Sequence, residues 1–400
     1  MKTELSSGKK LIPALLVIWG VAVALYFGMT AVEPALLETP RIFSYGTWAA
    51  GAASDYFYRF LWVVGDYSEG VAYRSIVSSI GLIVAGFAVH LLFIRGRAPK
   101  GIDPISYGLG AFPWIMLSSF TGLLVTSLLY GDLLTRGWIP TYLPGCTVPG
   151  AMILMYGCSM KAAFTVGILS GIIQFPLGLI ANVLAARLGL PGLSLITIFG
   201  MALACILIVE ITRLLPWMKG YVKGVEAPHF SPYRNAAARS VTPSTGWLLH
   251  RLLADFTEPF FIGSDVAGLG LVAGAVISWL LNPAHILYGT PGLFPAVLAG
   301  QLMSGSLAIS FYWKKHRDNG FCPTFTAIVS TSVCLVKFGP SLFNVMVLAA
   351  FNALITTTLA DFCMSWVAKH LKRYPNFIGS VVGMGVGVTI ISILLNYLSR

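Results

Sequence analysis

Charge is the scarcest property of this sequence. Only 10% of its 400 residues are Asp, Glu, Lys or Arg, whereas 56% are hydrophobic and the mean hydropathy is +0.80. A soluble domain usually carries about 25% charged residues, because its surface must be hydrated. The shortage excludes a mainly water-exposed fold and places most of the chain in lipid. We therefore predict an all-α integral membrane protein.

Catalytic signatures are also missing. The sequence contains no HExxH, GxSxG, P-loop or protein-kinase pattern, and no polar segment long enough to form a nucleotide-hydrolysing domain. These absences argue against ATP-driven pumping by this chain alone, and we expect neither an enzyme nor a protein with a cofactor or bound metal. The cysteines lie in apolar stretches without a CxxC pair, so we expect buried free thiols rather than disulfides. They are Cys146, Cys158, Cys205, Cys322, Cys334 and Cys363.

The sequence does contain a series of apolar runs long enough to span a bilayer, which takes about 20 residues of helix. The runs are continuously apolar rather than alternating, which favours helices over the strands of a barrel. The first run follows three lysines and exceeds the core of a signal peptide (roughly 7–15 residues), so we predict that it is retained as a helix. The runs cover residues 11–30, 75–94, 108–130, 162–186, 193–215, 264–281, 292–313, 341–368 and 376–397.

Basic residues give the chain a formal net charge of +11 and gather at the ends of these runs. This placement is typical of residues that set orientation during insertion, so we interpret the excess as topology and expect no nucleic acid partner. If the N-terminus is cytoplasmic, four basic clusters all lie on the cytoplasmic side only when two interrupted apolar stretches also span the membrane. These stretches are residues 139–158 and 321–338. The loop at 282–290, which has no Lys or Arg, then falls outside. The four clusters lie near residues 95–100, 217–251, 314–317 and 369–373.

This topology predicts about eleven transmembrane helices, arranged as one N-terminal helix and two units of five. An odd number of crossings per unit makes the units an inverted repeat, with the interrupted stretch as the broken third helix of each. We expect a multi-pass protein of the bacterial cytoplasmic (inner) membrane. The predicted parts are an N-terminal helix at 1–30, a first unit at 31–216 with a leading interfacial segment, a cytoplasmic linker at 217–250 and a second unit at 251–400.

The two units share short sequence patterns in the same order. Asp-Tyr-Ser-Glu at 66–69 returns as Asp-Phe-Thr-Glu at 255–258, and Pro-Thr-Tyr at 140–142 returns as Pro-Thr-Phe at 323–325. Internal symmetry of this kind is typical of transporter scaffolds in membranes. Three weaker matches keep the register: Ile-Gly-Leu-Ile at 80–83 with Leu-Gly-Leu-Val at 269–272, Gly-Ala-Phe-Pro at 110–113 with Gly-Leu-Phe-Pro at 292–295, and Ile-Phe-Gly-Met at 198–201 with Val-Val-Gly-Met at 381–384.

The broken third helices are the favoured position for a substrate or ion site. Proline removes a backbone donor, so an interrupted helix leaves backbone groups free to bind a ligand in a cavity. Neighbouring hydroxyls would add ligands without the cost of charge. The alternative, that prolines and small residues only allow close helix packing, has about equal weight. The candidate residues are Pro140, Thr141, Tyr142, Thr147, Pro323, Thr324, Phe325, Thr331 and Ser332.

The acidic motifs have two interpretations. Asp66 and Asp255 have the spacing of N-caps in a capping box, with Glu69 and Glu258 at the third helical position. Alternatively, acids at the start of a membrane helix bind a coupling ion, H+ or Na+. Capping is slightly favoured, because acids at helix starts already have an electrostatic explanation.

Two further charges, Asp265 and Lys337, lie within apolar runs of the second unit. An intramembrane charge is a functional candidate by default. Neither residue has a charged counterpart in the first unit, and such asymmetry fits a single substrate-specific charge. Asp265 follows the second acidic motif closely, so it completes the coupling candidates.

Three motifs carry a resemblance to other sequences: residues 66–69, Asn-Gly-Phe-Cys-Pro-Thr-Phe at 319–325, and Pro-Asn-Phe-Ile-Gly-Ser at 375–380. With these motifs the chain resembles a family of polytopic bacterial membrane proteins that has no assigned activity. The resemblance would cover nearly the whole chain. It implies a multi-pass membrane protein and assigns neither a function nor a site residue.

The leading functional hypothesis is a secondary active transporter for a small solute, coupled to H+ or Na+, with its site between the two broken helices. One alternative is a permease subunit that works with soluble partners, as in group translocation. Another is a membrane enzyme or assembly factor acting on lipid or on another membrane protein. The expected partners are the lipid bilayer, the solute and the coupling ion, and the sequence leaves a homodimer open.

Overall fold

The computed structural model describes residues 11–97, 110–136, 139–192, 195–222 and 243–398, in which all regular structure is helical. Eight helices or helix pairs in these residues are long and apolar enough to cross a membrane. Many of their large apolar side chains are exposed on the outside, including Leu16, Phe199 and Phe343, as lipid contact requires. The chain therefore has the all-helical, multi-pass character that its composition predicts.

The described residues form helices in the following order along the chain. Those near the N-terminus are α2 (Leu11–Glu38), α3 (Tyr45–Gly51), α4 (Tyr56–Asp66) and α5 (Ile76–Ile94). The rest of the first unit contains α6 (Phe112–Tyr130), α7 (Val148–Tyr156), α8 (Met160–Leu169), α9 (Phe175–Arg187) and α10 (Leu195–Leu214), and α11 (Lys219–Val222) lies at the start of the predicted linker. The second unit contains α13 (Thr245–Asp255), α14 (Asp265–Leu281), α15 (Leu293–Asn319), α16 (Phe325–Phe338), α17 (Leu342–Phe351), α18 (Thr357–His370) and α19 (Phe377–Leu398).

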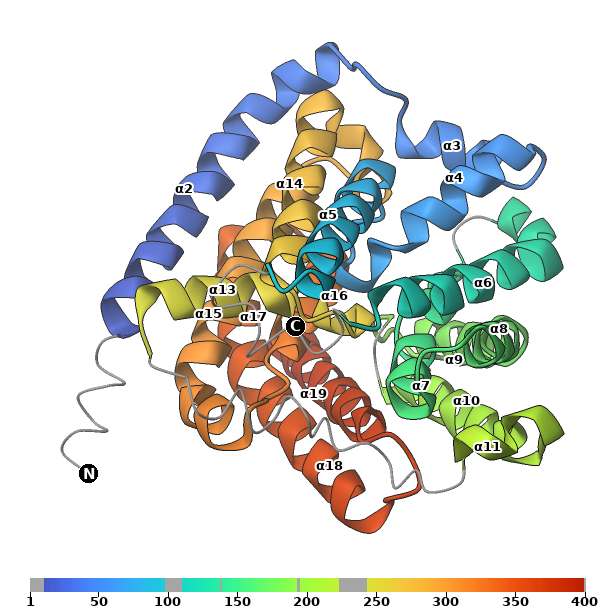
Figure 1. Ribbon diagram of the computed structural model, residues 1–400. Helices are drawn as coiled ribbons and strands as arrows, with labels where there is room; N and C mark the ends of the chain where they lie inside the picture. The colour runs from blue at the N-terminus through green and yellow to red at the C-terminus, as the bar shows by residue number, and fades with distance from the viewer. Residues whose placement is uncertain (1–10, 98–109, 137–138, 193–194, 223–242, 399–400) are drawn as a thin grey trace.

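The boundaries differ from the predicted ones in detail. Helix α2 continues to Glu38, past residue 30, and packs along α15 at the edge of the molecule (Figure 1). The interfacial segment forms two short helices, α3 and α4, and α13 begins within the predicted linker. Most of that linker, the N-terminal lysines and Lys100 lie outside the described residues. All six cysteines are free, but Cys158 is exposed rather than buried as predicted, and Cys363 is half-buried.

Helices α5 and α14, the first long helix of each unit, cross at the centre of the molecule (Figure 1). Gly81 and Gly270 occupy the same position in the repeated pattern, and each leaves no room for a side chain because the backbone of the other lies against it. Gly270 also lies against Ala85, whereas Gly274 lies against Val77. Residues later in α14 thus contact residues earlier in α5, so the two equivalent helices run antiparallel.

The crossing predicts a large effect of a bulky residue at its centre. Gly270→Leu is expected to lower the free energy of unfolding by about 1–3 kcal/mol, because the added side chain meets the backbone of Gly81. Gly28→Leu is the matched control, since Gly28 lies in α2 with no atom within 4 Å of an added Cβ. Thermal unfolding of both variants in detergent measures the difference, and equal melting temperatures would contradict the close crossing.

Local geometry repeats in the two units. After each acidic motif, a residue in the left-handed region, Ala72 (φ 68°) or Phe261 (φ 59°), turns the chain. The helix that follows begins at a serine cap, Ser75 or Ser264. The fourth long helix of each unit also contains one π-helical segment, Ser170–Gln174 between α8 and α9 and Asn352–Thr356 between α17 and α18. π-helical turns inside α-helices are rare, so their recurrence supports the register of the repeat.

The predicted breaks in the third helices are only half correct. In the first unit a 3-10 turn, Leu143–Gly145, is separated from α7 by Thr147 with φ 77°. In the second unit α16 is one uninterrupted helix that begins directly after Pro323 and Thr324. The first copy has additional prolines and glycines within the segment, whereas in the second copy Pro323 stands ahead of the first turn and breaks nothing.

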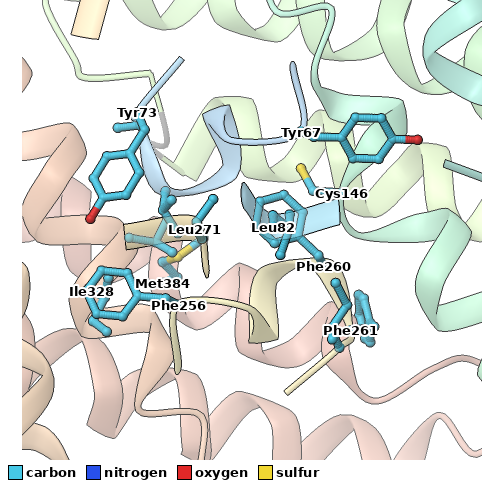
Figure 2. Close-up of a cluster of buried hydrophobic side chains, with 14 of the residues drawn as sticks. Tyr67, Tyr73, Leu82, Cys146, Phe256, Phe260, Phe261, Leu271, Ile328 and Met384 are labelled. Atoms are coloured by element: carbon cyan, nitrogen blue, oxygen red, sulfur yellow. The ribbon is translucent and has the colours of Figure 1, made fainter. Parts of the chain in front are cut away.

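Buried apolar side chains from both units form one core between them. Figure 2 shows Leu82 and Leu271, which occupy equivalent positions, among buried side chains that come from both units, from Tyr67 to Met384. Tyr73 of the first unit stacks on Phe256 of the second, with ring centroids 6.5 Å apart. The units therefore meet through a shared apolar interior rather than through separate domains.

Candidate functional site

The acidic motifs end helices instead of beginning them. Asp66 is the last residue of α4 and Asp255 is the last residue of α13, and each is followed by one 3-10 turn, Glu69–Val71 or Glu258–Phe260. The capping-box interpretation is therefore wrong. Because the chain turns through a left-handed residue before the next helix starts, serines that lie after this turn cap that helix instead.

In the first unit the acids surround a buried arginine. Arg74 Nη1 lies 2.9 Å from Glu69 Oε2 and also forms an ion pair with Asp66, and all three side chains are at most 1% exposed. The guanidinium lies over the Trp62 ring, 3.9 Å from its centre. Trp62 Nε1 donates to Thr141 Oγ1 at 2.6 Å, and that hydroxyl donates to Asp66 Oδ1 at 3.1 Å. The Pro-Thr-aromatic motif thus binds the acidic motif.

The second unit repeats this cluster with another arginine. Arg251 Nη2 lies 2.5 Å from Asp255 Oδ1 and 2.5 Å from Glu258 Oε1, and again the side chains are at most 1% exposed. Thr324 Oγ1 donates to Asp255 Oδ1 at 3.2 Å and accepts from Arg251 Nη2 at 3.4 Å. His316 Nε2 lies 3.3 Å from the same hydroxyl. Thr141 and Thr324, matched in sequence, are therefore matched in their contacts.

Each cluster carries two carboxyl groups and one guanidinium. If all groups are ionised, one negative charge is in excess at a site removed from water, which is costly without a neutralising partner. Oδ2 of Asp66 and Oδ2 of Asp255 are buried and have no hydrogen-bond partner among the described residues. The clusters thus have the chemistry to take up one proton or one small cation each.

The arginines are the functional residues that the sequence did not reveal. They come from different positions of the repeat, since Arg74 follows its acidic motif whereas Arg251 precedes Asp255 by one helical turn. Arg251 counted as a basic residue of the cytoplasmic linker, but its side chain is 1% exposed and cannot serve as an exposed topology signal. The spacing of Arg251 and Asp255 is that of a helical ion pair and was an available signal.

A small cavity of about 60 Å³, here called the central cavity, lies between the two units. Both aromatic residues of the Pro-Thr-aromatic motifs, Tyr142 and Phe325, line it, and so does Glu258 of the second cluster. Its walls contain residues at equivalent positions of the repeated sequence patterns. These pairs are Gly70 with Pro259, Tyr142 with Phe325, Cys146 with Val329 and Met201 with Met384.

A second cavity of about 810 Å³, here called the large cavity, lies beside the first. Gly70 and Tyr142 line both cavities, and Glu69 of the first cluster lines the large one. Tyr288, from the loop predicted to lie outside, also lines it and donates to Glu69 Oε1 at 3.1 Å. On its aromatic wall, burial raises the pKa of Tyr45 to about 12, so this hydroxyl stays protonated at neutral pH.

The other sequence candidates have mixed positions. Thr147 lines the central cavity and accepts from Gln174 Nε2 at 2.7 Å, which ties the first break to a π-helical segment. Ser332 is buried and accepts from Gln301 Nε2 at 2.8 Å. Asp265 lies 2.5 Å from His250 Nδ1 at the start of α14 and lines neither cavity. Neither cavity is lined by the remaining candidates, Pro140, Pro323 and Thr331.

The described residues contain no group of three or more His, Cys, Asp or Glu side chains that could hold a metal ion. No family model, curated protein or solved structure matches the chain. The resemblance to a bacterial membrane family therefore stays a prediction.

Proposed function

We propose that this protein is a secondary active transporter for a small solute, coupled to H+ or Na+. The observation that carries the proposal is the central cavity, which is lined by equivalent residues of both units and lies beside a much larger cavity. Transporters built from repeats bind their solute where the two halves meet. The acidic cluster of each unit reaches one of these cavities, through Glu258 or Glu69.

The two units, on this proposal, are an inverted repeat of five helices each. The antiparallel crossing of α5 and α14 supports it, because equivalent helices of an inverted repeat run in opposite directions. Three shorter apolar helices, Leu143–Tyr156, Asp265–Leu281 and Phe325–Phe338, add to the eight long ones. If all of these helices cross the membrane, their number is the eleven that the distribution of basic residues predicts.

Access alternates between the sides in the proposed mechanism. The large cavity is lined in part by Tyr288 and Thr290, from the loop predicted to lie on the outer side. On the predicted cytoplasmic side, Glu210 of α10 pairs with Arg373 and accepts from the Tyr374 hydroxyl at 2.8 Å. This hydrogen bond raises the pKa of Tyr374. These contacts join the last helix of the first unit to the loop between α18 and α19, and they would separate when the site opens inward.

The clusters are the proposed coupling sites. Each has one carboxylate in excess, so a proton or a sodium ion completes its charge balance. Binding the ion removes the cost of the uncompensated charge and so changes the relative stability of the outward-open and inward-open states. An ion that binds the two states with different affinity is what links solute movement to the ion gradient.

Flux into proteoliposomes tests the proposed function. Purified protein is reconstituted, a proton or sodium gradient is imposed, and uptake from a mixture of small metabolites is followed by mass spectrometry of the vesicle contents. We expect at least one solute to accumulate only while the gradient exists, and an ionophore that collapses the gradient should release it. If no solute accumulates under either gradient, the transporter proposal fails.

A further inference from the structure

Lys337 stands out in the large cavity. It lies in the last turn of α16 and lines the cavity, yet it forms no ion pair with an acid in the described part of the chain. Its ammonium nitrogen lies 5.4 Å from the centre of the Phe338 ring. An ammonium group in an apolar helix is costly unless it finds a negative partner.

The charge balance of the cavity leaves this ammonium uncompensated. Glu69 and Lys337 are the charged residues in its wall. Glu69 lies 2.9 Å from Arg74, and a proton or cation bound in the first cluster leaves Asp66, Glu69 and Arg74 together without net charge. The wall therefore has a net positive charge located at Lys337, and the missing partner is an anionic group that enters the cavity.

The rest of the wall selects for an apolar body. Tyr45, Trp62, Tyr142 and Tyr288 form its aromatic part, and the neighbouring helix contributes Val333 among other aliphatic residues. The volume of about 810 Å³ lies within the range of small-molecule sites, about 300–1,000 Å³. Aromatic walls with one charged group are the usual composition of a site for a small amphipathic ligand.

The central cavity continues this preference. Phe261, Phe321, Phe325 and Phe377 line it, and its one acidic residue, Glu258, is paired with Arg251. A solute that moves inward from the large cavity therefore meets an apolar environment. Such surroundings favour a body made of hydrocarbon or an aromatic ring over a strongly hydrated one.

We propose that the solute is an organic anion with a single negative charge and an apolar or aromatic body, and that Lys337 binds its anionic group. This inference rests on the proposed transport function. The equivalent position in the first unit is Leu154, so the protein has one such cation and one anion-binding position. A cation taken up by an acidic cluster would balance the charge of the anion as both cross.

Binding to the purified protein tests the charge of the solute. The probes are three series with the same bodies: hexanoate, octanoate, benzoate and phenylacetate, the corresponding amides, and the corresponding amines. Thermal shift in detergent is read for each. We expect at least one carboxylate to raise the melting temperature, with no comparable shift from its amide or amine. Equal or tighter binding of the amides or amines, or no binding of any carboxylate, would overturn the anion assignment.

Variants of Lys337 test its role. Lys337→Gln is expected to weaken carboxylate binding at least tenfold, whereas Lys337→Arg, which keeps the charge, should stay within about threefold of the wild type. Lys161→Gln is the control, because Lys161 is an exposed residue of α8 that lines neither cavity. Unchanged carboxylate binding by a folded Lys337→Gln protein would contradict the proposal.

The two proposals fail in different ways. Carboxylate binding that depends on Lys337, without flux under any ion gradient, would refute transport and keep the anion site. Gradient-driven uptake of a neutral or cationic solute that is unaffected by Lys337→Gln would refute the anion site and keep transport.

Discussion

Arg74→Met is expected to lower the free energy of unfolding by about 3–5 kcal/mol, enough to prevent most of the protein from folding. The substitution keeps an unbranched side chain but leaves the carboxylates of Asp66 and Glu69 buried without their guanidinium. Thermal unfolding and the yield of monodisperse protein in detergent measure the effect. The same loss is expected for Arg251→Met, whose acids are equally buried.

Two controls separate charge from packing. Arg373→Met removes an arginine whose pair with Glu210 is partly exposed, and it should cost less than about 1 kcal/mol. Combining Arg74→Met with Asp66→Asn and Glu69→Gln should recover most of the lost stability, because no uncompensated charge remains. If Arg74→Met were as stable as the wild type, or if the triple variant were no better than Arg74→Met, the cluster would not be held by charge balance.

Glu258→Gln is expected to lower accumulation of the solute, by removing one of the two coupling ions, while leaving exchange intact. The reason is that the substitution removes the excess carboxylate of the second cluster, and with it the site for that ion. A tenfold ion gradient supplies about 1.4 kcal/mol and holds about a tenfold solute gradient for each ion moved. In the variant one ion fewer is moved, so the solute gradient should fall about tenfold, although labelled solute still exchanges for unlabelled solute across the vesicle membrane.

The control for this prediction is Asp265→Asn. Asp265 was an equally good coupling candidate in the sequence, but it pairs with His250 and lines neither cavity. The Asp265→Asn variant should therefore accumulate solute as the wild type does. Normal accumulation by Glu258→Gln, or its loss in Asp265→Asn with the fold intact, would contradict the assignment of coupling to the buried clusters.

The long helices could be predicted from the sequence because each depends on a local property, a continuous apolar run. The positions of the repeated motifs could also be predicted from the sequence. Their contacts could not: Thr141 and Asp66 are 75 residues apart, and no local pattern indicates that their side chains meet. The acids were misinterpreted as caps because the chain returns Arg74 to Asp66 through a turn with Ala72 in the left-handed region, which no local pattern indicates. For Arg251 and Asp255 the helical spacing is a local signal.

The arginines show a further limit of reasoning from a repeat. A repeated pattern directs attention to residues that recur, whereas Arg74 and Arg251 occupy different positions and still fill the same role. At the position of Arg251 the first unit has Trp62, which contacts both Thr141 and the Arg74 guanidinium. The two units thus preserve the chemistry of the cluster and not the residue that supplies it.

The central claim, two units in opposite orientation around one cavity, is tested most directly by which side of the membrane each loop faces. In a background with all six cysteines replaced by serine, Lys219→Cys and Thr290→Cys introduce single exposed thiols after α10 and after α14. An impermeant maleimide is applied to intact spheroplasts and then to permeabilised ones. We expect Cys at 290 to react in intact spheroplasts and Cys at 219 only after permeabilisation. Reaction of both from the same side would contradict the inverted repeat.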